Sequence, residues 1–320
     1  MPSSLENLSG TYVPVVFISY YEPNAIANLV HLKETMKVED ALSVHGVKGL
    51  DAAHKAASEV ARSYRPDCPV FFTIDGDNQV GSRFNELRSR KLGEIENKLP
   101  FKLETGVVSF RAVNLVNGSC YGNGGVKLWS HEFVAKMQTH ETREDGNGPL
   151  DFCELPNYMH QPDVLSRTIP VGSPAQAFRA GYREGAKLLV LRNASPLRSL
   201  DDFTFRTVNQ WASIGTDVRY GAWCCIGTVY GIHDGLFNPE VARKSLVDHD
   251  LVSERAQDVV RLYGPDNREY PANTANPAYA EFLETYCKPL ARAGYLLGSP
   301  FSHRRSYWTR KILFDALGES

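Results

Sequence analysis

In the first 80 residues, short runs of apolar residues are separated by longer segments in which apolar residues recur at helical spacing. The apolar runs at 13–20, 41–47 and 69–74, the first of them rich in β-branched residues, predict three buried strands. Between them, residues 23–36 and 49–64 repeat apolar side chains at helical intervals, which predicts two amphipathic helices. This order of elements predicts a parallel α/β unit with right-handed crossovers, the kind of unit that binds ligands beyond the carboxyl ends of its strands.

The rest of the chain is more varied. The run YGNGGVKLW indicates a glycine-rich loop followed by a helix whose free N–H groups face a ligand. Residues 201–235 mix aromatic residues with glycines and are expected to complete the core. Beyond about residue 240, helical spacing dominates again.

Composition and charge narrow the class of protein. The chain has 320 residues, of which 42% are hydrophobic and 22% charged, so it can bury a sizeable core. The net charge of −2 gives no overall field that attracts a polyanion, and any nucleic-acid contact needs a local patch. The six scattered cysteines form no CxxC pair, and no apolar run is long enough to span a membrane. We therefore expect a cytoplasmic protein with reduced thiols and no membrane partner.

Two acids follow the third predicted strand, in the segment PVFFTIDGDN. Asp75 and Asp77 could simply cap a turn, and a two-metal nuclease also remains open. An EF-hand loop is excluded because its required glycine is Val80 here. In the remaining interpretation, the two carboxylates hold a divalent cation that neutralises the diphosphate of a nucleotide sugar.

The Asp-x-Asp at the end of this α/β half resembles the signature of GT-A fold glycosyltransferases, which use a nucleotide sugar and usually Mn²⁺ or Mg²⁺. Four further blocks look like glycosyltransferase-like proteins of bacteriophages and bacteria: VKGLDAAHKAA, SCYGNGGVKLW, DFCELPNY and SPAQAFRAGYREGAKL. The resemblance implies a GT-A type, Rossmann-like, mostly parallel sheet flanked by helices. It also implies a nucleotide-sugar-binding half at 1–150, an acceptor and catalytic half at 151–240, and a helical C-terminal extension at 241–320.

The resemblance also implies roles for individual residues. Asp77 would be the direct metal ligand, and Asp75 would face the ribose or a metal-bound water. Ser19, Tyr20 and Glu22, at the end of the first strand, would line the nucleotide pocket, where a tyrosine can stack on a base.

A second set of residues is expected near the diphosphate or the sugar. For these the alternatives are an exposed helix face, an ordinary glycine-rich turn, or pairing of the arginines with nearby acids. The set is Lys48, His54, Lys55, Gly124, Gly125, Lys127, Trp129, Arg179 and Arg183.

The sequence offers several candidates for the catalytic base and for a third metal ligand. An inverting transfer needs a carboxylate that accepts the acceptor's hydroxyl proton. Asp151 is the first candidate and Glu154 the second, because apolar neighbours surround both; Glu144 and Asp145 lie in a more polar loop. Candidate third metal ligands are His160 and His233, for which a structural role is the alternative.

Near the end of the chain, basic residues surround two aromatic ones in SHRRSYWTRKILF. This pattern is typical of contacts to single-stranded or flipped-out nucleic acid, although a terminal helix with a solvated basic face is the alternative. With the resemblance to phage proteins, it predicts a hydroxymethylated pyrimidine in phage DNA as acceptor and the host cytoplasm as location. The predicted DNA contacts are Arg304, Arg305, Tyr307, Trp308, Arg310 and Lys311.

The sequence thus predicts a metal-dependent glycosyltransferase with a UDP-sugar donor. A saccharide or protein acceptor stays open. A nucleotidyltransferase is another alternative, although SYYEPN lacks the glycine-rich basic loop of that class. A carbohydrate- or DNA-binding module with a degenerate site is the alternative that is not an enzyme.

Overall fold

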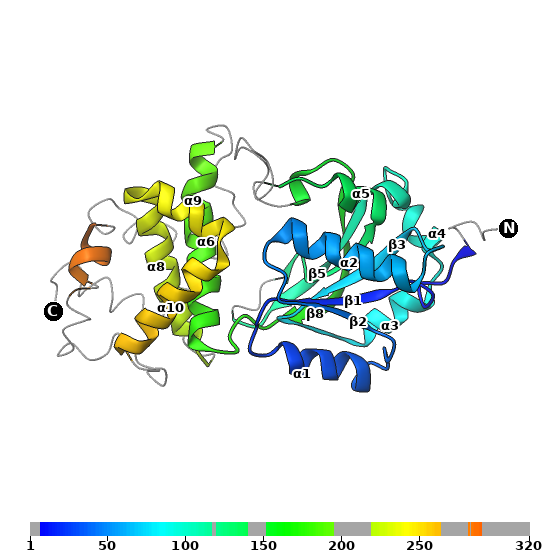
Figure 1. Ribbon diagram of the computed structural model, residues 1–320, viewed down its shortest axis with the longest axis horizontal. Coiled ribbons are helices and arrows are strands. Elements are labelled where there is room, and N and C mark those ends of the chain that lie inside the picture. The colour runs from blue at the N-terminus through cyan, green and yellow to red at the C-terminus, as the bar shows by residue number, and fades with distance from the viewer. Residues whose placement is uncertain are drawn as a thin grey trace. The chain divides into compact units, whose positions relative to one another are not determined.

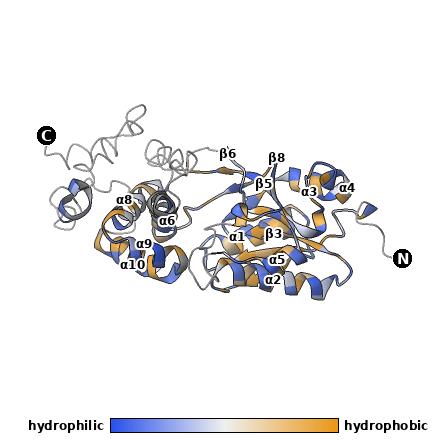
Figure 2. Cartoon of the chain, turned by 90° about the horizontal axis from the view of Figure 1, so that it is seen from above, coloured by the Kyte–Doolittle hydropathy of each residue, from blue (hydrophilic) through white to orange (hydrophobic). Residues whose placement is uncertain are grey.

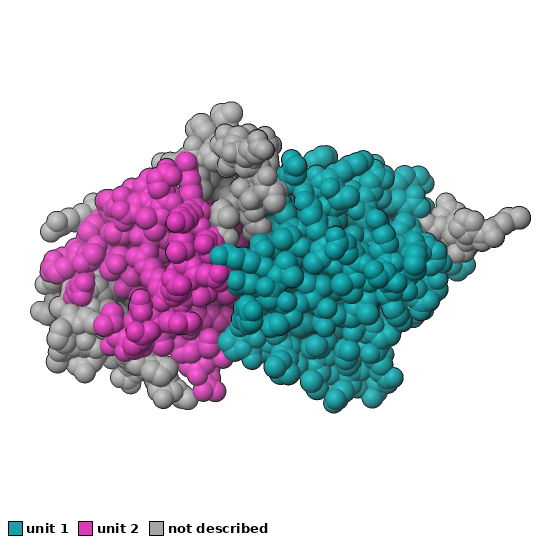
Figure 3. All heavy atoms as spheres, in the orientation of Figure 1, with its two compact units in different colours: residues 1–169 teal, residues 170–320 magenta. Residues whose placement is uncertain are grey.

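The chain divides into two compact units, residues 1–169 and 170–320 (Figure 1, Figure 3). The computed structural model describes residues 7–116, 120–139, 152–194, 219–263, 281 and 283–289. The described sheet lies within the first unit, whereas the regular elements described in the second are helical.

The first half of unit 1 has the predicted order of strands and helices. The three predicted strands are β1 (Val15–Ser19), β2 (Leu42–His45) and β3 (Val70–Asp75). The two predicted helices are α1 (Ala25–Val30), which η2 (His31–Thr35) continues as a π-helix, and α2 (Leu50–Tyr64).

The second half of unit 1 adds strands on the other side of β3, together with short helices. These elements are β4 (Asn78–Val80), α3 (Ser82–Ser89), α4 (Leu92–Glu96), η3 (Leu103–Thr105), β5 (Val107–Asn114), β6 (Cys120–Tyr121), β7 (Val126–Ser130), α5 (His131–Lys136), η4 (Phe152–Glu154) and β8 (Tyr158–Thr168).

The strands form one sheet in the order β2-β1-β3-β7-β5-β8-β4, with β6 paired to β5. The pairs β1–β2, β1–β3 and β5–β8 are parallel, whereas β3–β7, β5–β7, β4–β8 and β5–β6 are antiparallel. The expected α/β class is therefore confirmed, but the sheet is mixed rather than mostly parallel. Hydrophobic periodicity reports which residues are buried and not the direction in which a strand runs, so the sequence pattern could not show this.

The segment after the glycine-rich loop is a strand, and the prediction of a helix there was wrong. All five residues of β7 are buried, because β7 pairs with β3 on one side and β5 on the other. A short apolar run fits a buried strand and a buried helix equally well by periodicity. No helix N-terminus is therefore presented to a ligand at this point.

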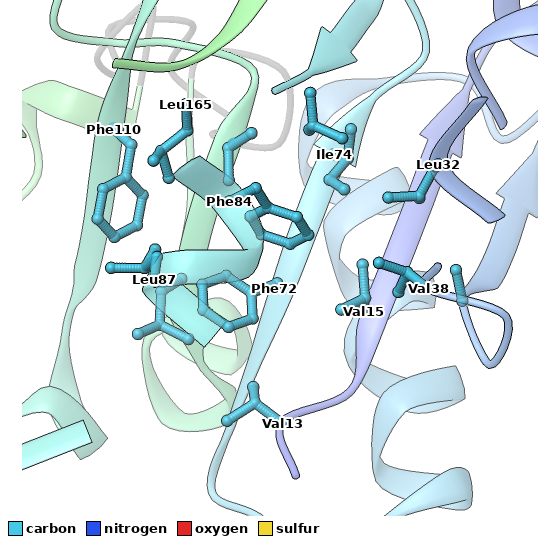
Figure 4. Close-up of a cluster of buried hydrophobic side chains, with 14 of the residues drawn as sticks. Val13, Val15, Leu32, Val38, Phe72, Ile74, Phe84, Leu87, Phe110 and Leu165 are labelled. Carbon is cyan, nitrogen blue, oxygen red and sulfur yellow. The ribbon is translucent and has the colours of Figure 1, made fainter. Parts of the chain in front are cut away.

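Two hydrophobic clusters cover the two faces of the sheet. On one face, Phe72 and Ile74 of β3 pack with Phe84 of α3 and Leu165 of β8 (Figure 4). On the other face, Phe71 belongs to a cluster with residues of α2 and α5. Burying such a side chain stabilises the fold by roughly 1.5–3 kcal/mol. Because β3 buries side chains on both of its faces, this packing holds β3 in the interior of the sheet.

Helix α2 shows how the sequence pattern produces this packing. Ala53, Ala57 and Ala61 recur every four residues and are buried. Figure 2 shows hydrophobic and hydrophilic residues alternating along α2. Gly49, at the N-cap of α2, has a φ of 97°, which glycine adopts at little cost. The glycine thus turns the chain from β2 into the helix.

In the described part of unit 2, the regular elements are α6 (Pro174–Ala194), α8 (Gly221–Phe237), α9 (Pro239–Val247), α10 (His249–Tyr263) and η6 (Leu283–Cys287). The helical spacing read beyond residue 240 is confirmed by α9 and α10. Among the residues that the structure describes, no helix combines the length and apolar character that crossing a membrane requires.

Candidate functional site

The carboxyl ends of β1, β2 and β3 meet at one edge of the sheet. Strand β1 is parallel to both neighbours, and its register places Ile18 beside Asp75 and Ser19 beside His45. Side chains that end these strands are therefore brought together, at the edge where open α/β sheets bind ligands.

The Asp75-Gly76-Asp77 turn is held by contacts from several elements. The Asp75 N–H donates to the Gly125 carbonyl at 3.0 Å, and Asn28 Nδ2 donates to the Gly76 carbonyl at 2.9 Å. A Cβ on Gly76 would lie 2.7 Å from Glu22 Oε2, closer than real Cβ atoms approach. A glycine is required because Ser19, which ends β1, packs directly against this turn, with its Cβ 2.8 Å from the position of such a side chain.

The two acids have different partners. Asp75 Oδ2 accepts a hydrogen bond from Lys127 Nζ at 2.7 Å, and Asp77 Oδ1 accepts one from Asn78 Nδ2 at 2.7 Å. Asn78 is itself fixed, because its Oδ1 accepts from the hydroxyls of Ser166 and Thr168 at 3.0 Å each. One carboxylate therefore faces a cation and the other a neutral amide.

Around the end of β1, the structure gathers polar and aromatic groups. Ser19 Oγ lies 2.8 Å from His45 Nδ1, and the Tyr20 N–H donates to Glu22 Oε2 at 2.6 Å. Tyr21 is 69% exposed, and its ring lies edge-on to His45 with 4.9 Å between centroids. Its φ of 58° is uncommon for a bulky residue, and backbone strain of this kind clusters at functional sites.

Sequence reasoning named Ser19, Tyr20 and Glu22 for this pocket but missed Tyr21 and His45. The available signal was position, because both residues end or follow predicted parallel strands at the ligand-binding edge. Their pairing across the strands depends on register, which the sequence does not show.

The glycine-rich segment packs closely against the protein itself. A Cβ on Gly125 would lie 2.1 Å from the Asn78 side chain, and one on Gly124 would lie 2.3 Å from the Phe110 carbonyl. Similarly, a Cβ on Gly122 would lie 2.9 Å from the ring of His160, a candidate metal ligand on β8. Internal packing explains why these positions are glycine, and the predicted wall between donor and acceptor stays a prediction.

Residues around the start of α2 differ in exposure. Lys48 precedes the cap residue Gly49, whereas His54 is buried, with its ring 4.5 Å from that of Trp129 and its Nδ1 2.8 Å from the Leu50 carbonyl. His54 thus lies in the cluster between α2 and the sheet and not on an exposed helix face.

Of the predicted bases, Asp151 lies outside the described residues, as do Glu144 and Asp145. Glu154 ends η4, whose Phe152 packs 4.7 Å from Trp129 and 5.4 Å from Lys127 Nζ. Phe152 therefore brings η4 close to the Asp75–Lys127 pair.

The candidates in unit 2 have contacts within that unit. Arg179 and Arg183 lie on α6, and Arg183 Nη1 is 3.2 Å from His249 Nε2. His233 on α8 packs with Phe237 and lies beside Asp234, with 3.7 Å between its Nδ1 and Asp234 Oδ1. Their roles toward the acids of unit 1 stay predictions.

Asp234 is the centre of a buried polar network in unit 2. It accepts a hydrogen bond from the Tyr182 hydroxyl at 2.7 Å and pairs with Arg255. Burial and then the neighbouring Asp234 carboxylate raise the pKa of Tyr182 well above its usual value. Arg255 also lies against the rings of Tyr182, Tyr230 and Tyr286, so it ties α10 to α6, α8 and η6.

The predicted DNA contacts fall outside the described residues. They are Arg304, Arg305, Tyr307, Trp308, Arg310 and Lys311.

The chemistry of the acids fits a hard divalent cation. Carboxylate oxygens are the ligands that Mn²⁺ and Mg²⁺ prefer, and both commonly complete their coordination with phosphate oxygens and water. Within the described part of the chain, no three His, Cys, Asp or Glu side chains gather as a metal-binding group. The carboxylates of Asp75 and Asp77 are of the type that such a cation prefers.

Comparison with models of known protein families and with characterised proteins gives no match. The interpretation of function therefore rests on the site and on the motifs of the sequence.

Proposed function

We propose that this protein is a metal-dependent glycosyltransferase of the GT-A type, which transfers a sugar from a UDP-sugar to an acceptor hydroxyl. One observation carries the proposal: the Asp75-Gly76-Asp77 turn lies at the sheet edge where β1 and β2 also end, and the exposed ring of Tyr21 follows β1 at that edge, against His45. At one edge of the sheet, an aromatic ring suits the base of a nucleotide sugar and polar groups suit its ribose. The two carboxylates suit the divalent cation that binds its diphosphate.

Each group has a distinct task in this proposal. Tyr21 stacks on the base, and the linked Ser19 and His45 offer hydrogen bonds to the base or ribose. Asp77, oriented by Asn78, is the principal ligand of Mn²⁺ or Mg²⁺. When bound, the cation neutralises charge on the departing diphosphate.

The acceptor side rests on the segment before β8. Asp151 or Glu154 accepts the proton of the attacking hydroxyl, and Phe152 between them packs beside Lys127 near Asp75. Asp151→Asn is expected to keep UDP binding and to remove turnover, because a base acts in the chemical step.

The proposed acceptor is a hydroxymethylated pyrimidine in phage DNA, with saccharide or protein hydroxyls as alternatives. Its support is the resemblance to phage proteins and the basic, aromatic stretch SHRRSYWTRKILF. A mass spectrum of nucleosides, taken after incubation with UDP-sugars, Mn²⁺ and modified DNA, would show a hexose or pentose increment. Sugar release without a DNA adduct would point to another acceptor.

Calorimetry with UDP, with and without Mn²⁺, tests the proposal most directly. The wild-type protein should bind UDP more tightly when Mn²⁺ is present. Asp77→Asn should lose roughly tenfold or more of that gain, because a neutral amide is a poor ligand for a hard cation. Asp258→Asn, which changes an exposed acid on α10, is the matched control and should behave like wild type.

Two results would contradict the proposal. If Mn²⁺ does not change the affinity of the wild-type protein for UDP, the protein is not a metal-dependent transferase. Release of sugar 1-phosphate instead of UDP from the UDP-sugar would identify the nucleotidyltransferase alternative, because that class attacks the α-phosphate.

A further inference from the structure

Lys127 is a buried cation placed directly beside the two acids. Its side chain is 5% exposed, whereas that of its partner Asp75 is 35% exposed. Lys127 lies opposite Thr73 in the β3–β7 pairing, so its side chain shares a face of the sheet with Asp75, two residues further along β3. Strand register therefore sets this contact, unlike the contact of a flexible surface lysine.

The surroundings of Lys127 make Asp75 its necessary counter-ion. Its Nζ lies 5.4 Å from the centre of the Phe152 ring, and Trp129, two residues along β7, is fully buried. An ammonium group in apolar surroundings is strongly destabilised unless an opposite charge contacts it. The Asp75 carboxylate supplies that charge at 2.7 Å.

This pairing changes the charge that the site offers to a metal ion. Asp75, Asp77 and Lys127 together carry a formal charge of −1, because the ammonium cancels one of the two carboxylates. A divalent cation bound directly to Asp75 would also lie close to the ammonium group, which repels it. Asp77 accepts a hydrogen bond from the neutral amide of Asn78.

We infer that Lys127 is a positioning residue that keeps Asp75 from ligating the metal in the nucleotide-free protein, so that the divalent cation and the diphosphate bind together. This inference rests on the proposed function and specifies how its metal site is filled. The diphosphate supplies negative charge in place of the Asp75 carboxylate, whose charge Lys127 cancels. The cation then binds between Asp77 and the phosphate oxygens.

The test is the affinity of the nucleotide-free protein for Mn²⁺, measured by calorimetry or by the electron paramagnetic resonance signal of free Mn²⁺. Lys127→Met keeps the apolar stem and removes the charge. We expect it to bind Mn²⁺ roughly tenfold more tightly than wild type, since a repelling cation a few ångströms away is gone. UDP should then increase Mn²⁺ affinity less than it does in the wild type. If Lys127 only held the fold together, its loss would weaken Mn²⁺ binding or leave it unchanged.

Further variants separate charge from packing. Lys127→Gln keeps a hydrogen-bond donor and should show the same gain, so it replaces Lys127→Met if that variant does not fold. Lys127→Arg keeps the charge and should bind Mn²⁺ as weakly as wild type. Adding Asp75→Asn to Lys127→Met should abolish the gain. Lys136→Met removes an exposed lysine of α5 and is the matched control.

The outcomes distinguish this inference from the proposed function. If wild type binds UDP in a Mn²⁺-dependent way but folded Lys127→Met and Lys127→Gln gain no Mn²⁺ affinity, the inferred role of Lys127 is wrong and the proposed transferase function is retained. If both variants gain Mn²⁺ affinity but wild type binds no UDP, the inferred role of Lys127 is supported and the proposed transferase function is wrong.

Discussion

At the scale of single residues, buried polar side chains in unit 1 are fixed by specific partners. His131 opens α5 and is buried, with Nδ1 2.7 Å from Ser58 Oγ and its ring stacked on Phe71 at 4.9 Å. Burial, with a smaller contribution from the nearby Arg62 guanidinium, lowers the pKa of His131 from 6.5 to about 4. The folded protein therefore holds this imidazole neutral where the unfolded chain would protonate it.

This difference predicts how stability depends on pH. Between pH 6.5 and 4 the unfolded state binds more protons at His131, so the free energy of unfolding should fall as the pH falls through this window. The full contribution of this residue is about 3 kcal/mol, from 1.36 kcal/mol per pKa unit. Urea unfolding at pH 7 and pH 4.5 measures it.

The control for this prediction is a variant that cannot titrate. His131→Gln should show a smaller loss of stability between the two pH values than wild type. An equal loss in His131→Gln and wild type would show that other groups cause the pH dependence.

At the scale of elements, α6 and α8 cross with their backbones in close contact. Glycines four residues apart line the crossing on both helices: Gly181 and Gly185 on α6, Gly227 and Gly231 on α8. A Cβ on Gly181 would lie 1.8 Å from the Cys224 carbonyl. The crossing therefore depends on the absence of side chains at these positions.

Gly227→Ala should destabilise unit 2, although alanine normally favours a helix over glycine by roughly 1 kcal/mol. The added Cβ would lie 1.9 Å from the Phe178 carbonyl, which forces the two helices apart. Overpacking of this kind typically costs about 1–3 kcal/mol, so the helix preference offsets only part of it. Thermal unfolding followed by circular dichroism should show a lower transition temperature.

Gly81→Ala is the matched control. Its Cβ would lie 3.8 Å from the Leu165 carbonyl, an ordinary contact, and its φ of −103° suits alanine. A Gly227→Ala protein as stable as this control would show that α6 and α8 can separate without loss.

At the scale of the whole molecule, the described residues of the proposed donor site belong to unit 1. Ser19, Tyr21, His45, Asp75 and Asp77 all lie within residues 1–169, and both hydrophobic clusters of the sheet lie there too. Unit 1 thus has its own core as well as the groups assigned to the nucleotide and the metal.

A fragment of residues 1–169 should therefore fold and bind UDP with Mn²⁺ within roughly threefold of the full chain, a difference under 1 kcal/mol. Circular dichroism checks the fold, and calorimetry measures the binding. A folded fragment that fails to bind, beside a full chain that binds, would assign donor contacts to unit 2. Arg179→Ala and Arg183→Ala in the full chain would then test the two predicted arginines.

The sequence by itself determined the elements of the first half and the place of the two acids. Burial patterns along one segment depend on local spacing, so β1, α1, β2, α2 and β3 could be read directly from their apolar positions. Because parallel strands end at one edge, it also followed that Asp75 and Asp77 lie at a ligand-binding edge with the end of β1.

The tertiary structure alone decided how distant segments meet. The insertion of β7 antiparallel between β3 and β5 places Lys127 against Asp75, and the β1–β2 register places His45 beside Ser19. The same packing buries His54 behind Trp129. Strand order, direction and register follow from the summed packing of the whole sheet, and no local spacing of apolar residues carries that information.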